Sequence, residues 1–421
     1  MPPPLIYNLF PRLAGTLDSW PGHAERARSM GFNWIFLNPI WQPGFSGSLY
    51  AVRDHDRVGR DFLPAGASPD GLAELERTLD TFRGSGLGTM IDLVINHTAI
   101  DSPLVEQHPD WFKRDERGAV LHPAAIDPAD ARRVTVWGDL AEIDNAASPD
   151  RQSLWAFWRD QVRRSLELGF TGFRCDAAYK VPAALWQELI GEARRIEPES
   201  CFVAETLGCR IEEVGALKSA GFDYLFNSSK YWNFDAPWAL EQHAQFGTIA
   251  PSISFPESHD TPRLMAETGG HLAVQRQRYL LAAVFSEGLL MPVGYEFGFT
   301  RPLHVVESRP QDWERTDLDL RAFIAAVNGL KLELGGLRAE GQLAAVSDFD
   351  RPTLVLEKTT ADRKTLVLVN KDWHQPQPMA VGDLQRPAVA SLIRIRPDGE
   401  VRRESVPAEL VLEPAEIALI A

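Results

Sequence analysis

The chain has 421 residues, of which 44% are hydrophobic and 24% are charged. This composition provides material for a large core and excludes a long disordered region. Acidic residues outnumber basic residues 58 to 43, which gives a formal net charge of −15. Nucleic acid is therefore not an expected partner, because its phosphate backbone would be repelled.

The three cysteines, Cys175, Cys201 and Cys209, show neither a disulfide framework nor metal-ligand spacing. The first residues, MPPPL, lack the basic and apolar regions of a signal peptide, and no apolar run is long enough to span a membrane. We therefore expect a soluble, cytoplasmic protein with no membrane partner.

Eight short apolar runs recur along the chain, and most are followed by a loop and a helical pattern. They cover residues 5–7, 34–37, 89–95, 172–175, 201–204, 224–226, 253–255 and 289–291. The clearest amphipathic stretches between them are 72–83, 154–168 and 184–196. Strand–helix alternation repeated eight times predicts a (β/α)8 TIM barrel of the α/β class.

Two segments interrupt this alternation. Residues 97–145 are too many for a strand-to-helix loop, and they predict a short B domain inserted after the third strand. After about residue 328 the pattern changes to period-two strands at 353–356, 365–369 and 416–420. We expect a barrel over 1–96 and 146–327, the insertion over 97–145, and a C-terminal antiparallel β-sandwich domain over 328–421.

Polar residues gather at the predicted carboxyl ends of the strands, where barrels of this kind build their active sites. The residues concerned are Asn96, His97, Arg174, Asp176, Glu205, Glu257, His259 and Asp260. Arg174 and Asp176 are two residues apart and share a strand face, so the arginine is expected to keep the carboxylate ionised. Glu205 follows an apolar run, which should raise its pKa and suit it to donate a proton. Each feature alone has a structural interpretation, but together they favour a catalytic site.

These segments resemble the four signatures of the α-amylase family (glycoside hydrolase family 13). The signatures are DLVINH at 92–97, GFRCDAA at 172–178, VAE at 203–205 and FPESHD at 255–260. The order and spacing agree with the family, and the resemblance extends over the whole chain, including its β-rich tail. Residues 7–12 and 176–182 are similar to intracellular amylase and maltosyltransferase-like branches.

The resemblance implies a retaining enzyme that acts on α-glucosidic bonds of maltooligosaccharides. Asp176 would be the nucleophile, Glu205 the general acid and base, and Asp260 a stabiliser of the oxocarbenium-like transition state. The residues implied to bind substrate are Tyr50, His97, Arg174 and His259, with Lys180 on the acceptor side. Tyr50 lies in GSLYAVRD at 47–54, which resembles the family loop whose tyrosine stacks on the sugar.

The second signature departs from the family, because Tyr179-Lys180 stands where Lys-His is common. That histidine commonly helps to hold calcium, so we expect no required cofactor, and Asn96 is the expected ligand if calcium is bound. In the insertion, Trp111 and Phe112 are interpreted as packing residues rather than sugar platforms. After the eighth strand, Arg309 and Trp313 are candidates for contact with donor-side sugar.

The signatures leave open what discharges the covalent intermediate. Our prediction is hydrolysis with transglycosylation, since the sequence contains no phosphate-binding cluster and no separate starch-binding module. The alternatives are an α-glucan glycosyltransferase, a trehalose-synthase-like isomerase, and a catalytically silent carbohydrate-binding subunit. Chain-length preference, linkage preference and oligomeric state do not follow from the sequence.

Overall fold

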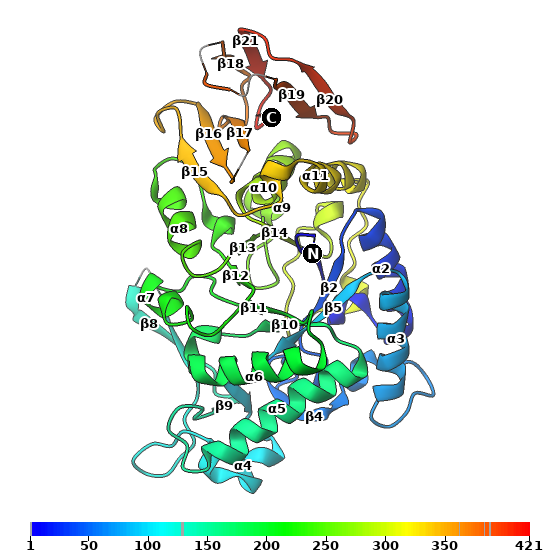
Figure 1. Ribbon diagram of the computed structural model, residues 1–421. Coiled ribbons are helices and arrows are strands. Elements are labelled where there is room, and N and C mark those ends of the chain that lie inside the picture. Colours follow the sequence, from blue (N-terminus) through cyan, green and yellow to red (C-terminus); the bar gives the residue numbers. More distant parts are fainter. Residues whose placement is uncertain (1, 128–129, 362, 383, 387–388) are drawn as a thin grey trace.

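The computed structural model describes residues 2–127, 130–361, 363–382, 384–386 and 389–421 (Figure 1). Eight parallel strands close into a barrel in the order β1-β14-β13-β12-β11-β10-β5-β2. The strands are β1 (Leu5–Leu9), β2 (Trp34–Leu37), β5 (Gly88–Leu93), β10 (Gly172–Cys175), β11 (Cys201–Ala204), β12 (Tyr224–Phe226), β13 (Ser252–Ser254) and β14 (Gly288–Pro292). Every predicted apolar run overlaps one of these strands, so the predicted TIM barrel is confirmed.

Helices surround the barrel (Figure 1). They are α1 (Pro11–Ala14), α2 (Trp20–Ser29), α3 (Leu72–Gly84), α5 (Arg151–Leu168), α6 (Ala183–Ile196), α7 (Ile211–Gly215), α8 (Trp238–Phe246), α9 (Leu264–Glu267), α10 (Leu272–Phe285) and α11 (Arg321–Glu333). In α6 the buried residues Leu185, Leu189 and Ala193 recur every four positions and form the apolar stripe of a helix packed on one side. None of the helices in the described part of the chain has the length and apolar character needed to cross a bilayer.

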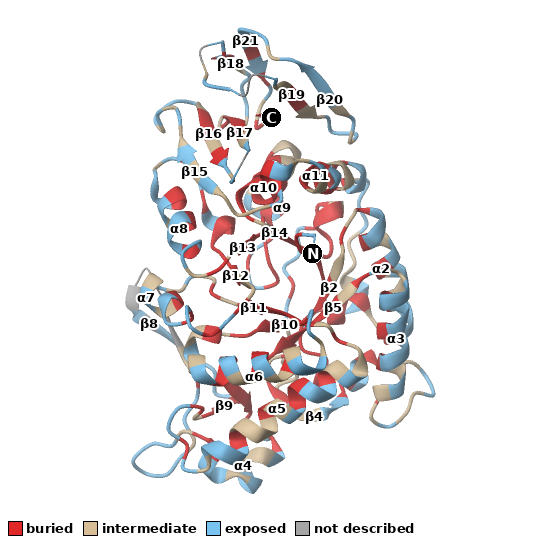
Figure 2. Ribbon diagram, viewed as in Figure 1, coloured by how far each residue is buried: buried red, intermediate tan, exposed pale blue. Residues whose placement is uncertain are grey.

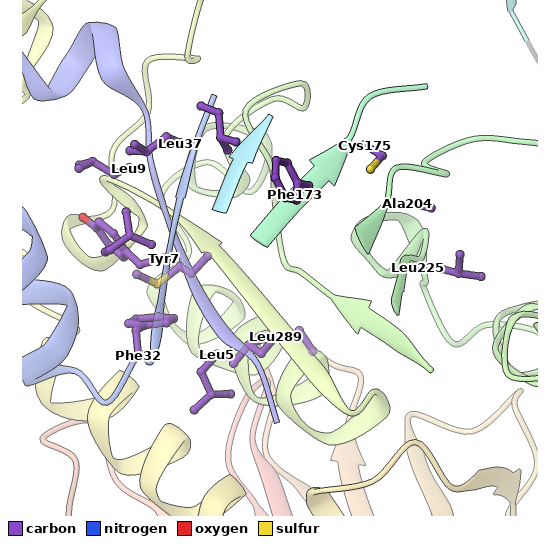
Figure 3. Close-up of a cluster of buried hydrophobic side chains, with 14 of the residues drawn as sticks. Leu5, Tyr7, Leu9, Phe32, Leu37, Phe173, Cys175, Ala204, Leu225 and Leu289 are labelled. Carbon is purple, nitrogen blue, oxygen red and sulfur yellow. The ribbon is translucent and has the colours of Figure 1, made fainter. Parts of the chain in front are cut away.

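Side-chain alternation along the strands produces two separate apolar layers. Leu5, Tyr7 and Leu9 of β1 point outward to the layer beneath the helices, part of which is drawn in Figure 3. Ile6 points inward and joins a second cluster inside the barrel. Both layers are buried, and most residues of the barrel strands are red in Figure 2. This alternation decides which residue of each strand reaches the barrel mouth.

The predicted insertion follows β5. It contains β6 (His97–Ala99) paired with β9 (Leu140–Glu142), the hairpin of β7 (Ala124–Asp127) and β8 (Asp130–Val136), and helix α4 (Pro103–Gln107). Trp111 and Phe112 are buried, and the Trp111 ring lies 5.4 Å from that of Phe157 on α5. These two aromatic residues therefore pack the insertion against the barrel, as interpreted from the sequence. A further hairpin, β3 (Trp41–Pro43) with β4 (Val52–Val58), follows β2.

The C-terminal part contains an antiparallel sheet in the order β15-β16-β17-β22-β19-β20 and a two-stranded sheet of β18 and β21. The strands are β15 (Gln342–Ala345), β16 (Thr353–Thr359), β17 (Lys364–Asn370), β18 (Gln377–Ala380), β19 (Ser391–Ile395), β20 (Val401–Ser405), β21 (Glu409–Leu412) and β22 (Ile417–Ile420). The expected C-terminal antiparallel β domain is confirmed, and β16, β17 and β22 match the three predicted strands. Residue 328 lies inside α11, and the exact division of the chain into domains stays a prediction.

Two buried lysines join this sheet and α11 to the end of α10. Lys331 of α11 donates to the carbonyl oxygens of Ala283 (2.8 Å), Ser286 (2.7 Å) and Leu337 (2.7 Å). Lys358 of β16 donates to the carbonyl of Val284 at 2.6 Å, and burial lowers the pKa of Lys358 to about 8. The last carbonyls of a helix have no partner within the helix, so these ammonium groups satisfy acceptors that would otherwise be unpaired.

We predict that Lys331→Met lowers the free energy of unfolding by about 2–4 kcal/mol, because three buried carbonyls lose their donor. The midpoint of chemical denaturation measures this change. Lys364→Met is the matched control, since Lys364 pairs with Glu357 at 2.8 Å and remains one-third exposed. The control should be close to wild type. Equal stability of the two variants would contradict the role given to Lys331.

Candidate active site

Arg174 lies at the centre of the barrel mouth. Its side chain points inward because the neighbouring Phe173 and Cys175 belong to the outer layer. Nη1 lies 2.9 Å from Asp92 Oδ1 and 2.6 Å from Asp176 Oδ1, and Nη2 lies 3.9 Å from Asp260 Oδ2. The predicted pairing of Arg174 with Asp176 is therefore present, with two further carboxylates around the same guanidinium.

Asp92 is a member of this cluster that sequence reasoning did not single out. It lies within β5, is fully buried, and accepts a hydrogen bond from the Tyr50 hydroxyl at 2.7 Å in addition to those from Arg174. Burial raises the pKa of Asp92 to about 6, Asp176 adds to the rise, and Arg174 opposes it. The sequence feature that could have identified Asp92 is an ionisable residue within an apolar strand. A carboxylate that is buried in this way is normally paired with another group.

Glu205 follows β11, which is the barrel strand next to β10, the strand that Asp176 directly follows. Its carboxylate accepts hydrogen bonds from the backbone N–H groups of Ala177 and Leu207, both at 3.0 Å. Ala177 adopts φ 41°, in the left-handed region that non-glycine residues rarely occupy, directly after Asp176. Burial raises the pKa of Glu205 to about 7, with repulsion from Asp176 and Asp260 opposed by Arg174. The expectation that an apolar setting raises this pKa agrees with the structure.

Asp260 is the most exposed of these carboxylates, with 49% of its side chain accessible. Its Oδ2 lies 3.0 Å from His259 Nε2. Burial alone would raise the pKa of Asp260, but His259 and Arg174 outweigh burial and lower it. Asp260 therefore presents an accessible carboxylate to whatever occupies the mouth.

Tyr50 and His259 form one wall of the site. Their rings are stacked, with centroids 5.8 Å apart and planes inclined by 4°, and the Tyr50 hydroxyl lies 2.6 Å from His259 Nε2. The same hydroxyl accepts from the amide of Asn38 at 3.0 Å. Tyr50 is thus fixed by groups from three strand ends, and its ring is a flat surface suited to a sugar face.

His97 and Lys180 differ in their settings. His97 is buried, and neither ring nitrogen meets a partner with hydrogen-bond geometry among the described residues. An unpaired buried ring nitrogen is costly unless a ligand supplies the partner. Lys180 is exposed on the rim, where Nζ donates to the backbone oxygen of Ala124 at 2.9 Å and lies 5.9 Å from the ring centroid of Trp137. Lys180 therefore connects the barrel mouth to the insertion.

The possible calcium ligand Asn96 has a buried Oδ1 without a hydrogen-bond partner. In the described residues, however, no group of three or more His, Cys, Asp and Glu side chains is placed to hold a metal ion. No chemical step is assigned to a metal here, and the expectation of no required cofactor stays a prediction.

Three other sequence candidates, Glu257, Trp313 and Arg309, have partners of their own within the protein. Glu257 is buried in an ion pair with Arg263 at 2.7 Å and accepts from the Leu264 N–H at 2.6 Å, so it supports the loop that carries His259 and Asp260. Trp313 packs on Phe299, with ring centroids 5.2 Å apart. Arg309 donates to backbone oxygens of its own loop.

A small cavity lies beneath Arg174, Glu205 and Asp260. Its floor is formed by four apolar side chains of the inner barrel layer, Phe36, Phe226, Phe255 and Leu290. An apolar floor keeps water away from the carboxyl groups and accounts for the effect of burial on Glu205. The site therefore holds a carboxyl with a raised pKa and an ion-paired carboxylate on neighbouring strands, which is the arrangement needed for acid–base and nucleophilic chemistry.

Comparisons with known proteins show which sequences and folds this chain is similar to. Residues 5–126 match the family model described as glycogen debranching enzyme, glucanotransferase domain. The chain is 29% identical over 430 residues to the alpha-1,4-glucan:maltose-1-phosphate maltosyltransferase of Burkholderia pseudomallei. The aligned region covers 99% of this chain but 37% of that protein. It is 22% identical to the maltogenic alpha-amylase of Bacillus acidopullulyticus, covering 87% of this chain and 64% of that protein.

Among solved structures, an alpha-amylase from Lactobacillus plantarum has the same fold, with a TM-score of 0.79 at 21% identity. That comparison covers 99% of this chain and 98% of the other. The chain thus matches the whole of this solved structure, whereas it spans less than two thirds of the length of the two curated relatives above.

The raised pKa of Glu205 predicts a pH-dependent effect on stability. The ordinary value of 4.5 rises to about 7 on folding. The contribution of this carboxyl is therefore fully present below pH 4.5 and is lost as the pH rises through about 7. Glu205→Gln cannot ionise, so its stability relative to wild type should increase between pH 5 and pH 8 by up to about 3 kcal/mol. Thermal denaturation at both pH values measures this, and an identical difference at the two would contradict the raised pKa.

Proposed function

Because the chain belongs to the α-amylase family, we propose that it is a retaining enzyme that cleaves α-glucosidic bonds of maltooligosaccharides by double displacement. The observation that carries this proposal is the presence of two carboxyl groups in different environments on neighbouring strands. Asp176 is ion-paired with Arg174 at 2.6 Å, whereas Glu205 has a pKa raised to about 7 by burial. One group is suited to attack carbon and the other to deliver a proton.

In the first step the Asp176 carboxylate attacks the anomeric carbon, and the bond from that carbon to the leaving oxygen breaks. Glu205 gives its proton to the leaving oxygen as this bond breaks. Positive charge develops on the sugar ring, and the negative carboxylate of Asp260 is placed to stabilise it. The products of this step are a glycosyl ester of Asp176 and the carboxylate of Glu205.

In the second step Glu205 removes a proton from the acceptor hydroxyl, and the acceptor oxygen attacks the anomeric carbon. The ester bond to Asp176 breaks, so both carboxyl groups return to their initial states. Water as the acceptor gives hydrolysis, and a sugar hydroxyl gives transglycosylation. We propose hydrolysis with transglycosylation on maltooligosaccharides as the main activity.

A second candidate is glycosyl transfer from an anionic donor. It is supported by the name of the Burkholderia relative, a maltose-1-phosphate maltosyltransferase. Lys180 adds to this support, because its ammonium group lies on the rim and donates to a backbone carbonyl rather than to a carboxylate. The Lys180 position would place a positive charge near the group that leaves or enters on the acceptor side.

We expect Asp176→Asn and Glu205→Gln each to lower kcat/KM at least about 1,000-fold on maltooligosaccharides. In the wild-type enzyme kcat/KM should fall as the pH rises above about 7, because Glu205 loses the proton it must donate. With an activated glycosyl fluoride, Glu205→Gln should accumulate a covalent adduct on Asp176, measured by mass spectrometry. Full activity of Asp176→Asn would show that the nucleophile is misassigned.

Product analysis separates the candidate activities. Incubation with maltose, maltotriose, maltoheptaose and maltose 1-phosphate should give shorter glucans and some longer transfer products. Release of phosphate with extension of a glucan acceptor would instead support transfer from maltose 1-phosphate. Trehalose formed from maltose would support the isomerase, and binding without turnover would support a silent subunit.

A further inference from the structure

Arg12 is a buried arginine in α1, the short helix after β1, and is remote in sequence from the signatures. Only 4% of the residue is exposed. Nε donates to the carbonyl of Val305 at 2.7 Å, Nη1 pairs with Asp61 Oδ2 at 2.9 Å, and Nη2 donates to the carbonyl of Gly47. All three guanidinium nitrogens therefore have partners, each in a different segment of the mouth.

Two of those partners belong to the loop that carries Tyr50 and to the loop after β14. Gly47 is three residues before Tyr50, and it adopts φ 73°, so the chain turns there. The Leu49 N–H donates at 3.2 Å to the same Val305 carbonyl that accepts from Arg12. The Tyr50 loop is thus held at two points, on the carbonyl of Gly47 and the amide of Leu49, by one guanidinium and one shared carbonyl.

The position of Tyr50 matters because its hydroxyl bonds both to Asp92 and to His259. Because few backbone contacts fix the loop that carries Tyr50, the loss of any one of them makes the position of Tyr50 less precise. Removing the guanidinium would take its donor from the partly buried carbonyl of Gly47 and leave the Val305 carbonyl with the Leu49 N–H alone. A displacement of about 1 Å in a substrate-positioning group can cost about 100-fold in rate.

We propose that Arg12 is a positioning residue that fixes Tyr50 against Asp92 and His259 by binding both the loop between β3 and β4 and the loop after β14. Asp61 balances the charge of the guanidinium but is itself 59% exposed. The two carbonyl contacts, rather than this ion pair, therefore set the loop position. This inference rests on the proposed function, in which Tyr50 contacts the sugar being cleaved.

The test is a double-mutant cycle with Tyr50. Arg12→Gln should lower kcat/KM on maltooligosaccharides 10- to 100-fold in the wild-type background, and less than threefold in the Tyr50→Ala background. The reason is that Arg12 has little left to position once the ring is absent. Arg12→Lys, which keeps the charge and one or more donors, should recover part of the loss. An equal loss from Arg12→Gln in both backgrounds would overturn the proposal.

A second measurement does not depend on activity. Hydrogen exchange at the Leu49 amide should become at least tenfold faster in Arg12→Gln and faster by a smaller factor in Arg12→Lys, while exchange in β16 is unchanged. Unchanged exchange at Leu49 would also overturn the proposal. Arg351→Gln is the matched control, because its guanidinium is exposed and pairs with Asp348 at 3.4 Å.

The two measurements distinguish failure of this inference from failure of the proposed function. If Asp176→Asn retains activity, the proposed function is wrong, and the Leu49 amide still reports whether Arg12 holds the loop. If Asp176→Asn is inactive but the double-mutant cycle is additive, the proposed function stands and the positioning role of Arg12 does not.

Discussion

The site depends on one buried guanidinium. Arg174 is almost fully buried and is bounded by the carboxylates of Asp92 and Asp176, with Asp260 at 3.9 Å. A buried charge of either sign is costly alone, so these groups stabilise each other only as a set. Glu205 lies outside these ion pairs, and burial raises its pKa to about 7 although Arg174 opposes the rise. In the proposed mechanism, this difference between Asp176 and Glu205 separates the two roles that a double displacement requires.

Much of this arrangement follows from strand periodicity. The outward positions of Phe173 and Phe202 require that Arg174 and Glu205 face the barrel interior. The barrel, its closure and the C-terminal β domain were predictable because eight apolar runs alternate with helices. The edge strands of the C-terminal sheets could not be predicted, because strands such as β20 are mostly exposed and do not alternate between apolar and polar residues.

Contacts between loops escaped sequence reasoning for a different physical reason. Asp92 could be recognised as an anomaly, since it is ionisable within an apolar strand. Arg12 and Lys180 each donate to backbone carbonyls, and every residue carries a carbonyl, so no residue type identifies their partners. The burial of Glu257 with Arg263 was likewise invisible, because an acid at a strand end looks the same whether it faces the mouth or supports it.

The lysines at the end of α10 have a consequence for how the protein is made. Lys358 belongs to β16, and the carbonyls it satisfies end the helix that precedes the last barrel strand. During synthesis from the N-terminus, this helix leaves the ribosome well before β16 does. The end of α10 therefore stays without one of its two lysine donors until part of the tail has emerged. In this fold, part of the polar pairing at the end of α10 forms only after β16 has been synthesised.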